Sequence, residues 1–395
     1  MKVLILNNDF RVYWKGRLIY LRKFLAAKGI ELYATELFGK GSPYSFDSYR
    51  DTEDWWTCLF ADHNSDELSK KEIAKNLFAK LDKIDPDIII ACPVTFFAGA
   101  LGIRWAKQHK KKFIMFDDAK LAQFKRNFLV QTVKDLIIKQ SDGLWLPSAE
   151  YYEDYNRLNS KNILFFNGYS CIDNSRFKFK EAKNLNYHTI ICVARLVPIK
   201  NIDNLLRAWQ LIEQENVNYK LKIIGDGPGR NDLNRLSQEL GLKNVEFAGT
   251  IDNDELPSHL YQSDALILPS LSETWGLVVN EAMAGGMPVL LSNKVNACES
   301  LLKEGVNGYS FDPLNINQMA TAILKFIKLT EAEKSEMSAQ SLIIIDTMSY
   351  ENMGQKLVDA MINIEAKKFK KPGLLAGTLI KRWYGKDDRS AWDKL

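Results

Sequence analysis

The sequence predicts an α/β protein built from two doubly wound domains that follow one another along the chain. Three observations support this prediction: the length of 395 residues, an alternation of short apolar runs with amphipathic segments of helix length, and a break near the middle after which the alternation starts again. A chain of this length exceeds the size at which a single hydrophobic core usually stops growing.

Short apolar runs predict five β-strands in the first half: Val3–Asn7, Asp87–Ala91, Phe113–Phe116, Gly143–Leu146 and Ile163–Phe165. The segments Gly16–Lys28 and Leu68–Leu81 carry apolar residues three and four positions apart, which is typical of helices. Strands that are apolar throughout and are separated by helices belong to a parallel sheet covered on both faces.

A polar, lysine-rich stretch, Lys178–Asn186, interrupts this pattern and predicts a linker. Five more strands are predicted after it: Thr189–Ala194, Lys220–Ile224, Val245–Ala248, Ala265–Leu268 and Pro288–Ser292. A helical segment follows each of them. We therefore expect an N-terminal Rossmann-like domain over 1–175, a second such domain over 187–350, and a C-terminal helix and tail over 351–395.

Composition excludes several classes of protein. A formal net charge of +4 is too small to indicate a nucleic-acid partner. The apolar run at the N-terminus is too short for a signal peptide, and no stretch approaches the ~20 apolar residues of a spanning helix. The 5 cysteines include no C-x-x-C pair, which fits a reducing compartment. We therefore expect a cytoplasmic protein.

The last residues have a composition of their own. After a predicted helix, Tyr350–Ala366, basic residues flank an apolar patch, and no acidic residue occurs between Glu365 and Asp387. With Trp383 as an aromatic anchor, residues 367–386 suit the surface of an anionic membrane, and peripheral association there is one expectation. The alternative is a solvated helix that packs on the body of the protein, and Pro372-Gly373 interrupts any continuous helix.

The strongest chemical signal is the segment Glu273-Thr-Trp-Gly-Leu-Val-Val-Asn-Glu281. It follows the predicted strand Ala265–Leu268, and ligands bind at such strand ends. The N–H groups from Trp275 to Val278 would point at an anion, and the two carboxylates would accept hydrogen bonds from sugar hydroxyls. The alternative is an exposed loop residue and a surface helix residue. However, Glu281, expected about two turns into the helix, has apolar neighbours, where an unpaired carboxylate is costly.

Two further loops carry weaker signals. Arg195 and Lys200 share one strand-to-helix loop, where two cations suit a diphosphate, although solvated loop charges are also common. In Gly225-Asp-Gly-Pro-Gly229 the glycines allow a tight turn and close approach of a ligand. The spacing is not the G-x-G-x-x-G fingerprint, because we expect the helix to start at Pro228. An ordinary strand-to-helix turn is the alternative there.

Together these segments resemble the donor-binding domain of glycosyltransferase family 4, the retaining group 1 glycosyltransferases of GT-B fold. The resemblance extends to Val245-Glu-Phe-Ala-Gly249 and to Ala284-Gly-Gly-Met-Pro-Val289, and it covers roughly Asn167 to Pro313. It implies two Rossmann-like domains that face each other across a cleft. It also implies an enzyme that moves a sugar from a nucleotide-diphosphate donor to an acceptor with retained anomeric configuration.

The resemblance implies that Arg195 and Lys200 bind the donor diphosphate and stabilise the leaving charge, and that Glu273 contacts the transferred sugar. It implies that Glu281 holds the ribose hydroxyls. The full set of residues that it places on the donor is Gly16, Gly225, Asp226, Gly249, Thr274, Trp275, Gly276, Leu277, Val278 and Glu281.

The N-terminal half matches the family less well. Lys15-Gly16-Arg17 stands in the place of a glycine-bearing loop near the phosphates, with one glycine where two are usual. After the strand Phe113–Phe116, where many members carry a histidine, this sequence has Asp117 and Asp118. These two residues are expected on the acceptor side, with a helix N-cap pair as the alternative.

No metal and no cofactor are expected. Asp85-Pro-Asp87 spells a D-x-D motif, but it directly precedes an apolar strand and predicts a turn. The 4 histidines show no metal-ligand spacing. The expected partners are a nucleotide-sugar donor and a glycan or lipid-linked acceptor, in the synthesis of a bacterial surface polysaccharide or lipopolysaccharide. The alternatives are a GT-B-like sugar-nucleotide epimerase or phosphorylase, and a non-catalytic sugar-nucleotide-binding scaffold.

Overall fold

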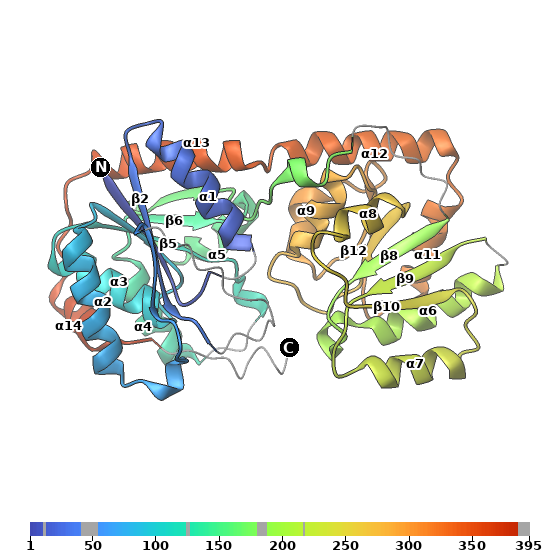
Figure 1. Ribbon diagram of the computed structural model, residues 1–395, viewed down its shortest axis with the longest axis horizontal. Helices are drawn as coiled ribbons and strands as arrows, with labels where there is room; N and C mark the ends of the chain where they lie inside the picture. The colour runs from blue at the N-terminus through green and yellow to red at the C-terminus, as the bar shows by residue number, and fades with distance from the viewer. Residues whose placement is uncertain (11–12, 41–53, 124–126, 180–187, 216–217, 386–395) are drawn as a thin grey trace. The chain divides into compact units, whose positions relative to one another are not determined.

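The computed structural model describes residues 1–10, 13–40, 54–123, 127–179, 188–215 and 218–385. The chain forms two α/β units, which are described separately (Figure 1). Of the described residues, the first unit contains those within 1–170 and 350–385, and the second contains those within 171–349. Residues 171–175 thus group with the second unit. Most of the predicted linker Lys178–Asn186 lies outside the described residues.

In its described residues, the first unit has a 7-stranded sheet with the order β3-β2-β1-β4-β5-β6-β7, and all neighbouring strands are parallel. Its strands are β1 (Lys2–Asn7), β2 (Glu31–Phe38), β3 (Trp56–Phe60), β4 (Ile88–Ala91), β5 (Lys112–Phe116), β6 (Gly143–Leu146) and β7 (Leu164–Asn167). Five of them were predicted to within two residues at each end. β2 and β3 were missed because polar residues such as Glu36 and Thr57 interrupt their apolar runs.

Helices cover this sheet: α1 (Tyr13–Ala26), α2 (Lys70–Ile84), α3 (Phe97–Gln108), α4 (Phe128–Ile138), α5 (Tyr152–Asn156), α13 (Tyr350–Glu365) and α14 (Leu374–Arg382). Short 3₁₀ turns occur in both units: η1 (Ser65–Glu67), η2 (Leu121–Gln123), η3 (Ala149–Tyr151), η4 (Asn174–Arg176) and η5 (Pro198–Lys200). Capping decides where α2 begins, because the Ser69 hydroxyl accepts a hydrogen bond from the N–H of Glu72 at 3.2 Å.

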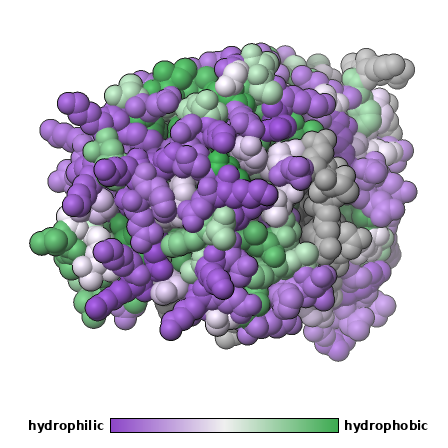
Figure 2. All heavy atoms as spheres, turned by 60° about the vertical axis from the view of Figure 1, so that its left-hand side comes forward, coloured by the Kyte–Doolittle hydropathy of each residue, from purple (hydrophilic) through white to green (hydrophobic). Residues whose placement is uncertain are grey.

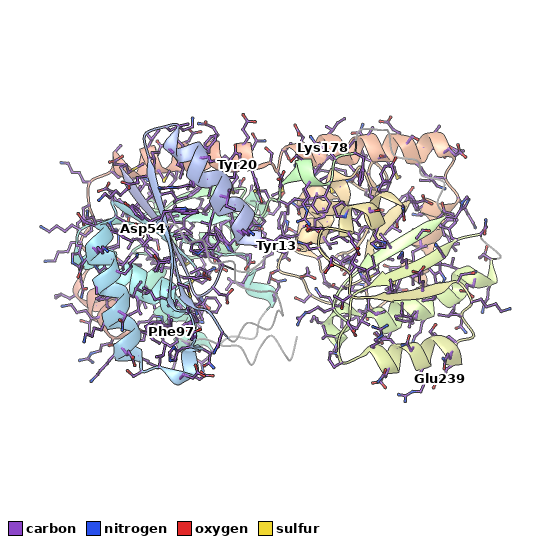
Figure 3. The ribbon with its side chains drawn as sticks, viewed as in Figure 1. Tyr13, Tyr20, Asp54, Phe97, Lys178 and Glu239 are labelled. Atoms are coloured by element: carbon purple, nitrogen blue, oxygen red, sulfur yellow. The ribbon has the colours of Figure 1, made fainter. Side chains whose placement is uncertain are left out.

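Gly16 lies in the first turn of α1, so its expected location in a loop is wrong. A Cβ at this position would lie 2.4 Å from the hydroxyl oxygen of Tyr350, the first residue of α13. Tyr20, one turn further along α1 and labelled in Figure 3, packs on the same tyrosine, with ring centroids 5.3 Å apart. The glycine therefore allows α1 and α13 to pack closely within the first unit.

The C-terminal segment, expected as a separate helix and tail, is part of the first unit: α13 packs against α1 and β7, and α14 packs against α3 and α4. The buried Arg104 of α3 donates hydrogen bonds to the carbonyls of Ile380 at 3.0 Å and Trp383 at 2.6 Å. The Trp383 indole N–H in turn donates to the carbonyl of Val94 at 2.6 Å. These bonds fasten the carboxyl end of α14, where helix carbonyls have no intrahelical donor.

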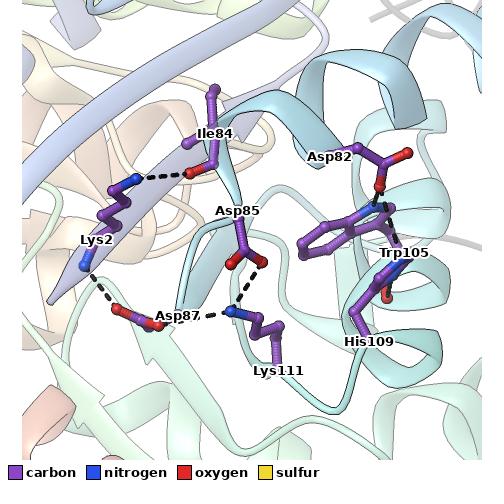
Figure 4. Close-up of polar contacts among 8 residues, drawn as sticks. All are labelled: Lys2, Asp82, Ile84, Asp85, Asp87, Trp105, His109 and Lys111. Atoms are coloured by element: carbon purple, nitrogen blue, oxygen red, sulfur yellow. Dashed lines mark hydrogen bonds and ion pairs between the residues drawn. The ribbon is translucent and has the colours of Figure 1, made fainter.

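The D-x-D motif forms a turn at the amino end of β4, as predicted (Figure 4). Asp85 ends α2 in the left-handed conformation, with φ 47°. Lys111 Nζ lies 2.9 Å from Asp85 and 3.6 Å from Asp87. The Asp87 carboxylate also accepts the backbone N–H of Lys2 at 2.8 Å. Lys111 holds the pKa of Asp85 below its usual range. These carboxylates thus have structural partners. They lie at the amino end of β4, whereas Asp117 and Asp118 follow the carboxyl end of β5 in the same sheet.

In its described residues, the second unit has a 6-stranded sheet with the order β10-β9-β8-β11-β12-β13, again with all neighbours parallel. Its strands are β8 (Thr189–Val193), β9 (Lys220–Ile224), β10 (Val245–Gly249), β11 (Ala265–Leu268), β12 (Val289–Ser292) and β13 (Gly308–Phe311). β13 was missed, since its four residues include one polar serine and a glycine. The prediction of two Rossmann-like α/β domains is thereby confirmed.

The helices of the second unit are α6 (Ile202–Gln214), α7 (Arg230–Glu239), α8 (Leu256–Tyr261), α9 (Leu277–Ala284), α10 (Asn296–Leu301), α11 (Ile316–Ile327) and α12 (Glu331–Asp346). α6 and α11 pack against each other. Their apolar residues, spaced three and four apart, bury Leu205, Trp209, Met319 and Ile323 in one core with β8 and β9. This core fixes α6 and α11 against β8 and β9.

Strand order places a switch point in each sheet. The chain builds outward in one direction from β1 or β8, then returns to start β4 or β11 on the other side of that strand. In open α/β sheets ligands bind outside the carboxyl ends of the strands at such a point. In the second unit this point lies between β8 and β11, the strands that precede Arg195 and Glu273.

We predict that Arg104→Ala lowers the free energy of unfolding by about 3 kcal/mol, because two helix-end carbonyls lose a charged donor. Chemical denaturation followed by fluorescence measures this. Arg235→Ala, which removes an exposed arginine from α7, is the control and should cost less than about 0.5 kcal/mol. Equal losses for both variants would contradict the role of Arg104.

Candidate functional site

The candidate site lies on the loops that leave the carboxyl edge of the second sheet. Because all strands of this sheet are parallel, the loops after β8, β9, β10 and β11 emerge at the same edge. The loops after β8, β9 and β11 carry Arg195 with Lys200, Gly225 with Asp226, and Glu273 with Gly276, and Gly249 is the last residue of β10. The fold therefore gathers residues from three separate sequence motifs.

Asn201 anchors the loop after β8. It has left-handed backbone geometry, with φ 57°, and its side chain is buried. Its amide donates hydrogen bonds to the carbonyl of Pro269 at 3.1 Å, after β11, and to that of Pro313 at 2.8 Å, after β13. One side chain thus joins the ends of three strands. Sequence reasoning missed Asn201, although an asparagine between a loop and a helix is a residue type that tolerates this conformation.

Lys200 and Glu273 meet directly above the switch point. The backbone N–H of Leu271 donates to the carbonyl of Ile199 at 2.8 Å, which holds the loops after β8 and β11 together. The Lys200 ammonium then forms a hydrogen-bonded ion pair with Oε2 of Glu273. The side chains are 16% and 19% exposed, so both are shielded yet reachable from solvent. The same carboxylate oxygen accepts a hydrogen bond from the Ser270 hydroxyl at 3.4 Å.

The segment from Glu273 to Trp275 is fastened to the loop after β12. The N–H of Glu273 donates to the carbonyl of Lys294, and the N–H of Asn296 donates back to the carbonyl of Glu273, both at 3.3 Å. The Asn296 side-chain amide donates to the carbonyl of Thr274 at 3.0 Å. The backbone around Glu273 is therefore held on both sides. Asn296 is a second positioning residue that the sequence did not reveal.

Trp275 is buried, and its indole N–H donates to the side-chain oxygen of Asn280 at 2.8 Å. The tryptophan was expected to contact a donor through its backbone, and the structure shows that its ring packs inside the unit. Ring and amide together fix the loop against the first turns of α9, in which Asn280 lies. The side chain of Trp275 thus has a structural role.

Gly276 is the N-cap residue of α9, directly before its first residue Leu277. Its φ of 93° is in the region that favours glycine, and a Cβ would lie 3.2 Å from Cγ of Glu273. Leu277 and Val278 occupy the first turn of α9, where a helix has no intrahelical acceptor for backbone N–H groups. An anion next to Glu273 and Lys200 would therefore find peptide dipoles that favour it.

Glu281 lies just over one turn into α9, not about two turns as expected, because the helix starts at Leu277. The residue is only 4% exposed. A carboxylate at this depth requires polar partners to offset the loss of hydration. Its burial therefore agrees with the argument from its apolar neighbours, and it excludes the alternative of a surface helix residue.

The glycines after β9 make room for the loop after β8. Gly225 has a φ of 131°, and a Cβ there would lie 2.0 Å from the carbonyl oxygen of Ala194. The N–H of Leu196 donates to the carbonyl of Asp226, and the N–H of Gly229 donates to the carbonyl of Leu196, both at 2.9 Å. The close approach is thus between two loops of the protein, which sets the backbone on both sides of Arg195. Gly229 caps α7, which starts at Arg230 and not at Pro228 as expected.

Asp226 has structural partners. Its carboxylate accepts the N–H of Gly227 at 2.7 Å and pairs with Arg230 at 3.0 Å. These contacts, the backbone bond first, hold the pKa of Asp226 below its usual range. Gly249 is next to this pair: it has a φ of 74°, and a Cβ there would lie 3.2 Å from a guanidinium nitrogen of Arg230. A nucleotide that contacts Asp226, as expected, would meet a carboxylate that is also paired with Arg230.

Asp117 and Asp118, expected on the acceptor side, follow β5 in the first unit. Asp117 accepts the Tyr155 hydroxyl at 2.5 Å and the N–H of Ala119 at 3.0 Å, so it shapes the turn. Asp118 is exposed. No α-helix follows them directly, and the alternative of a helix N-cap pair is wrong; the next element is the 3₁₀ turn η2.

Over the described ranges, no three or more His, Cys, Asp or Glu side chains are grouped so that they would hold a metal ion. The helices within those ranges include none that combines the length and apolar content needed to cross a bilayer. The loop after β8 carries two cationic side chains, the half-buried Arg195 and Lys200, and the latter is paired with Glu273.

Comparison with known proteins shows which families and structures the chain resembles. Residues 173–341 match the family model of glycosyl transferases group 1. The GDP-mannose-dependent alpha-(1-6)-phosphatidylinositol monomannoside mannosyltransferase of Mycobacterium tuberculosis is 31% identical over 147 residues, which are 35% of this chain and 38% of that protein. The poly(glycerol-phosphate) alpha-glucosyltransferase of Bacillus subtilis is 26% identical over 240 residues, which are 58% of this chain and 35% of that protein. The chain spans well under two thirds of the length of these curated relatives.

Solved structures share the fold of the whole chain. A sucrose-phosphate synthase from Thermosynechococcus elongatus superposes with a TM-score of 0.74 at 18% identity, over 93% of this chain and 100% of that one. Anabaena HepE in complex with UDP-glucose superposes with a TM-score of 0.69 at 15% identity, over 92% and 100%. The family match and these neighbours support the group 1 glycosyltransferase superfamily and a GT-B fold.

We predict that Asn201→Ala lowers the free energy of unfolding by about 3 kcal/mol, because the Pro269 carbonyl loses its side-chain donor, the Pro313 carbonyl keeps only the 3.5 Å bond from Asn204, and the left-handed backbone is strained. Asn201→Gly is the matched control: it loses the same hydrogen bonds but removes the strain, and should cost about 1 kcal/mol less. Thermal and denaturant unfolding measure both. Identical costs would contradict the contribution of the backbone conformation.

We also predict that Gly225→Ala lowers the free energy of unfolding by about 4 kcal/mol, through backbone strain and the clash with the carbonyl of Ala194. Gly241→Ala is the control, since Gly241 also has a positive φ, 70°, but no atom lies within 4 Å of the position that its new methyl group would take. It should cost about 1 kcal/mol. A Gly225→Ala protein as stable as the control would refute the close contact between the loops.

Proposed function

We propose that this protein is a retaining glycosyltransferase of family 4, which moves a sugar from a nucleotide-diphosphate donor bound on the loops of the second unit. The observation that carries this proposal is the Lys200–Glu273 pair above the switch point between β8 and β11, beside the first turn of α9. A cation, a carboxylate and helix N–H groups meet there, inside the segment that matches the glycosyltransferase family.

The cations would hold the diphosphate. Arg195 offers a planar guanidinium fork and Lys200 a compact positive charge, both of which suit phosphate oxygens. The N–H groups of Leu277 and Val278 would bind the same anion at the helix end. As the bond between sugar and phosphate breaks, negative charge grows on the departing oxygen, so preorganised donors bind the transition state more strongly than the ground state. These groups would replace a metal ion.

The carboxylates would hold the sugars. Glu273, oriented by Lys200 and Ser270, would accept hydrogen bonds from hydroxyls of the transferred sugar. Glu281, which is 4% exposed, would accept those of the ribose. Gly225 and Gly249 would lie on the nucleotide side, where Gly225 shapes the loop through its close contact with the carbonyl of Ala194.

Retention of configuration is proposed from the resemblance to family 4, and it would have to occur without a double displacement through the enzyme. A double displacement through the enzyme needs two carboxylates flanking the anomeric carbon, whereas Glu273 is committed to Lys200 and Glu281 is buried in α9. We infer that the departing diphosphate itself accepts the proton of the incoming hydroxyl on the same face. The new glycosidic bond forms on the face from which the phosphate leaves.

The acceptor would be a glycan or a lipid-linked molecule, and the setting a cytoplasmic step in bacterial surface polysaccharide or lipopolysaccharide synthesis. The names of two relatives support this class of acceptor, since one contains a phosphatidylinositol mannoside and the other a poly(glycerol-phosphate). Asp117 and Asp118 in the first unit would serve the acceptor side.

We expect Lys200→Ala and Arg195→Ala each to lower donor turnover by about 10²–10³-fold, because each removes a donor to the developing negative charge. A screen of nucleotide sugars for thermal stabilisation identifies the donor first, since a ligand that binds the folded state raises its apparent stability. Turnover of that donor, with and without acceptor sugars, is then measured together with its binding constant.

Lys220→Ala is the control for these variants, because Lys220 lies at the opposite, amino end of the same sheet and is half exposed. It should leave turnover and donor binding unchanged. Wild-type turnover in the Lys200 variant would defeat the proposal, provided that its melting temperature matches that of the control. If the protein instead converts the donor to its epimer in the absence of an acceptor, the proposed glycosyltransferase activity is wrong and the protein is an epimerase.

A further inference from the structure

Two helices of the first unit expose large apolar side chains on their first turns. On α4, Phe128 is 80% exposed and Leu129 is 72% exposed. On α14, Leu374 is 95% exposed and Leu375 is 64% exposed. Single exposed apolar residues need no explanation, but two adjacent pairs on neighbouring helices mark an interaction surface.

The helices that carry these pairs are well fixed. α14 packs against α4 and α3, with Ala376 and Ile380 buried beneath it. The Asn127 side chain caps α4 by accepting the N–H groups of Leu129 at 2.9 Å and Val130 at 3.3 Å. The exposed leucines and phenylalanine therefore stand on ordered first turns, and the body of the unit does not cover them.

The charge around α14 has one sign. The chain from residue 366 to 385 carries exposed basic side chains and no Asp or Glu, and these basic residues are Lys367, Lys368, Lys370, Lys371, Lys381 and Arg382. On α4 the acidic Asp135 is paired with Arg157 at 3.0 Å. Figure 2, which brings the left-hand side of Figure 1 forward, shows apolar patches set among hydrophilic side chains. Apolar side chains thus lie beside a run of positive charge.

Trp383 does not take part in this surface. It was expected to be an aromatic anchor, but its indole N–H donates to the carbonyl of Val94 and its own carbonyl accepts Arg104. The end of α14 therefore packs on the body, as one of the two alternatives expected, while the first turn of the helix remains exposed.

We propose that α4, the segment 367–373 and α14 form a docking surface for an anionic lipid bilayer. The leucine and phenylalanine side chains would enter the boundary between headgroups and acyl chains, and the lysines would lie among anionic headgroups. A bilayer fits better than a protein groove, because the two apolar pairs stand on separate helices rather than on one continuous apolar face, and four lysines shortly precede the pair on α14. The proposal concerns the first unit and does not depend on the donor site.

The test is co-sedimentation of the full chain with vesicles of phosphatidylglycerol and phosphatidylcholine, and with vesicles of phosphatidylcholine alone. We expect binding to the anionic vesicles that weakens as salt rises. Leu374→Ser with Leu375→Ser, and Phe128→Ser with Leu129→Ser, should each lower vesicle affinity about tenfold or more. Lys368→Glu with Lys371→Glu should lower it by a similar factor, since each basic residue contributes about fivefold.

The control is Leu314→Ser with Ile343→Ser, which removes two apolar residues of the second unit that are 71% and 62% exposed. It should bind vesicles like the unchanged protein, and melting temperatures verify that all variants fold. Absence of binding to anionic vesicles, or binding that the α14 and α4 variants retain, overturns the proposal. So does a dimer in sedimentation velocity that the Leu374 and Leu375 variant loses, because a second copy of the chain would then cover this surface.

Discussion

The contact between the loops after β8 and β11 is the constraint on which the candidate site depends. Lys200 and Glu273 are 73 positions apart in the chain, and they meet because their strands are neighbours in a parallel sheet. Asn201 and the backbone bond from Leu271 to Ile199 hold the two loops in register. A cation and a carboxylate held together by such bonds would need little reorganisation to bind the donor that we propose.

The glycines that were expected to contact a ligand have different structural roles. At Gly225 the space for a side chain is filled by the carbonyl of Ala194, and at Gly16 by the hydroxyl of Tyr350. At Gly276 a positive φ lets the chain turn from Glu273 into α9. Sequence spacing marks a glycine as necessary, but only the neighbours in space reveal what its missing side chain makes room for.

The C-terminal segment connects stability with a surface. Arg104 and Trp383 bind the end of α14 to α3 and to the loop after β4. Because the helix is held by its carboxyl end, its first turn can remain uncovered without unfolding. The exposed leucines and the lysines before them thus stand on a rigid support, which is what a docking surface for a lipid bilayer requires.

The sequence by itself determined the fold class and the strands that are apolar throughout, because burial on both faces of a parallel sheet leaves an unbroken apolar run. It also identified Arg195, Lys200, Glu273 and Glu281 as candidate binding residues, since charged residues next to buried strands need a polar partner or a ligand. It missed β2, β3 and β13, whose polar residues interrupt the apolar pattern. Only the tertiary structure decided that Asn201 joins three strand ends, that Gly16 lies in a helix and that Trp383 faces inward. These depend on which distant segments become neighbours, and local residue patterns carry no such information.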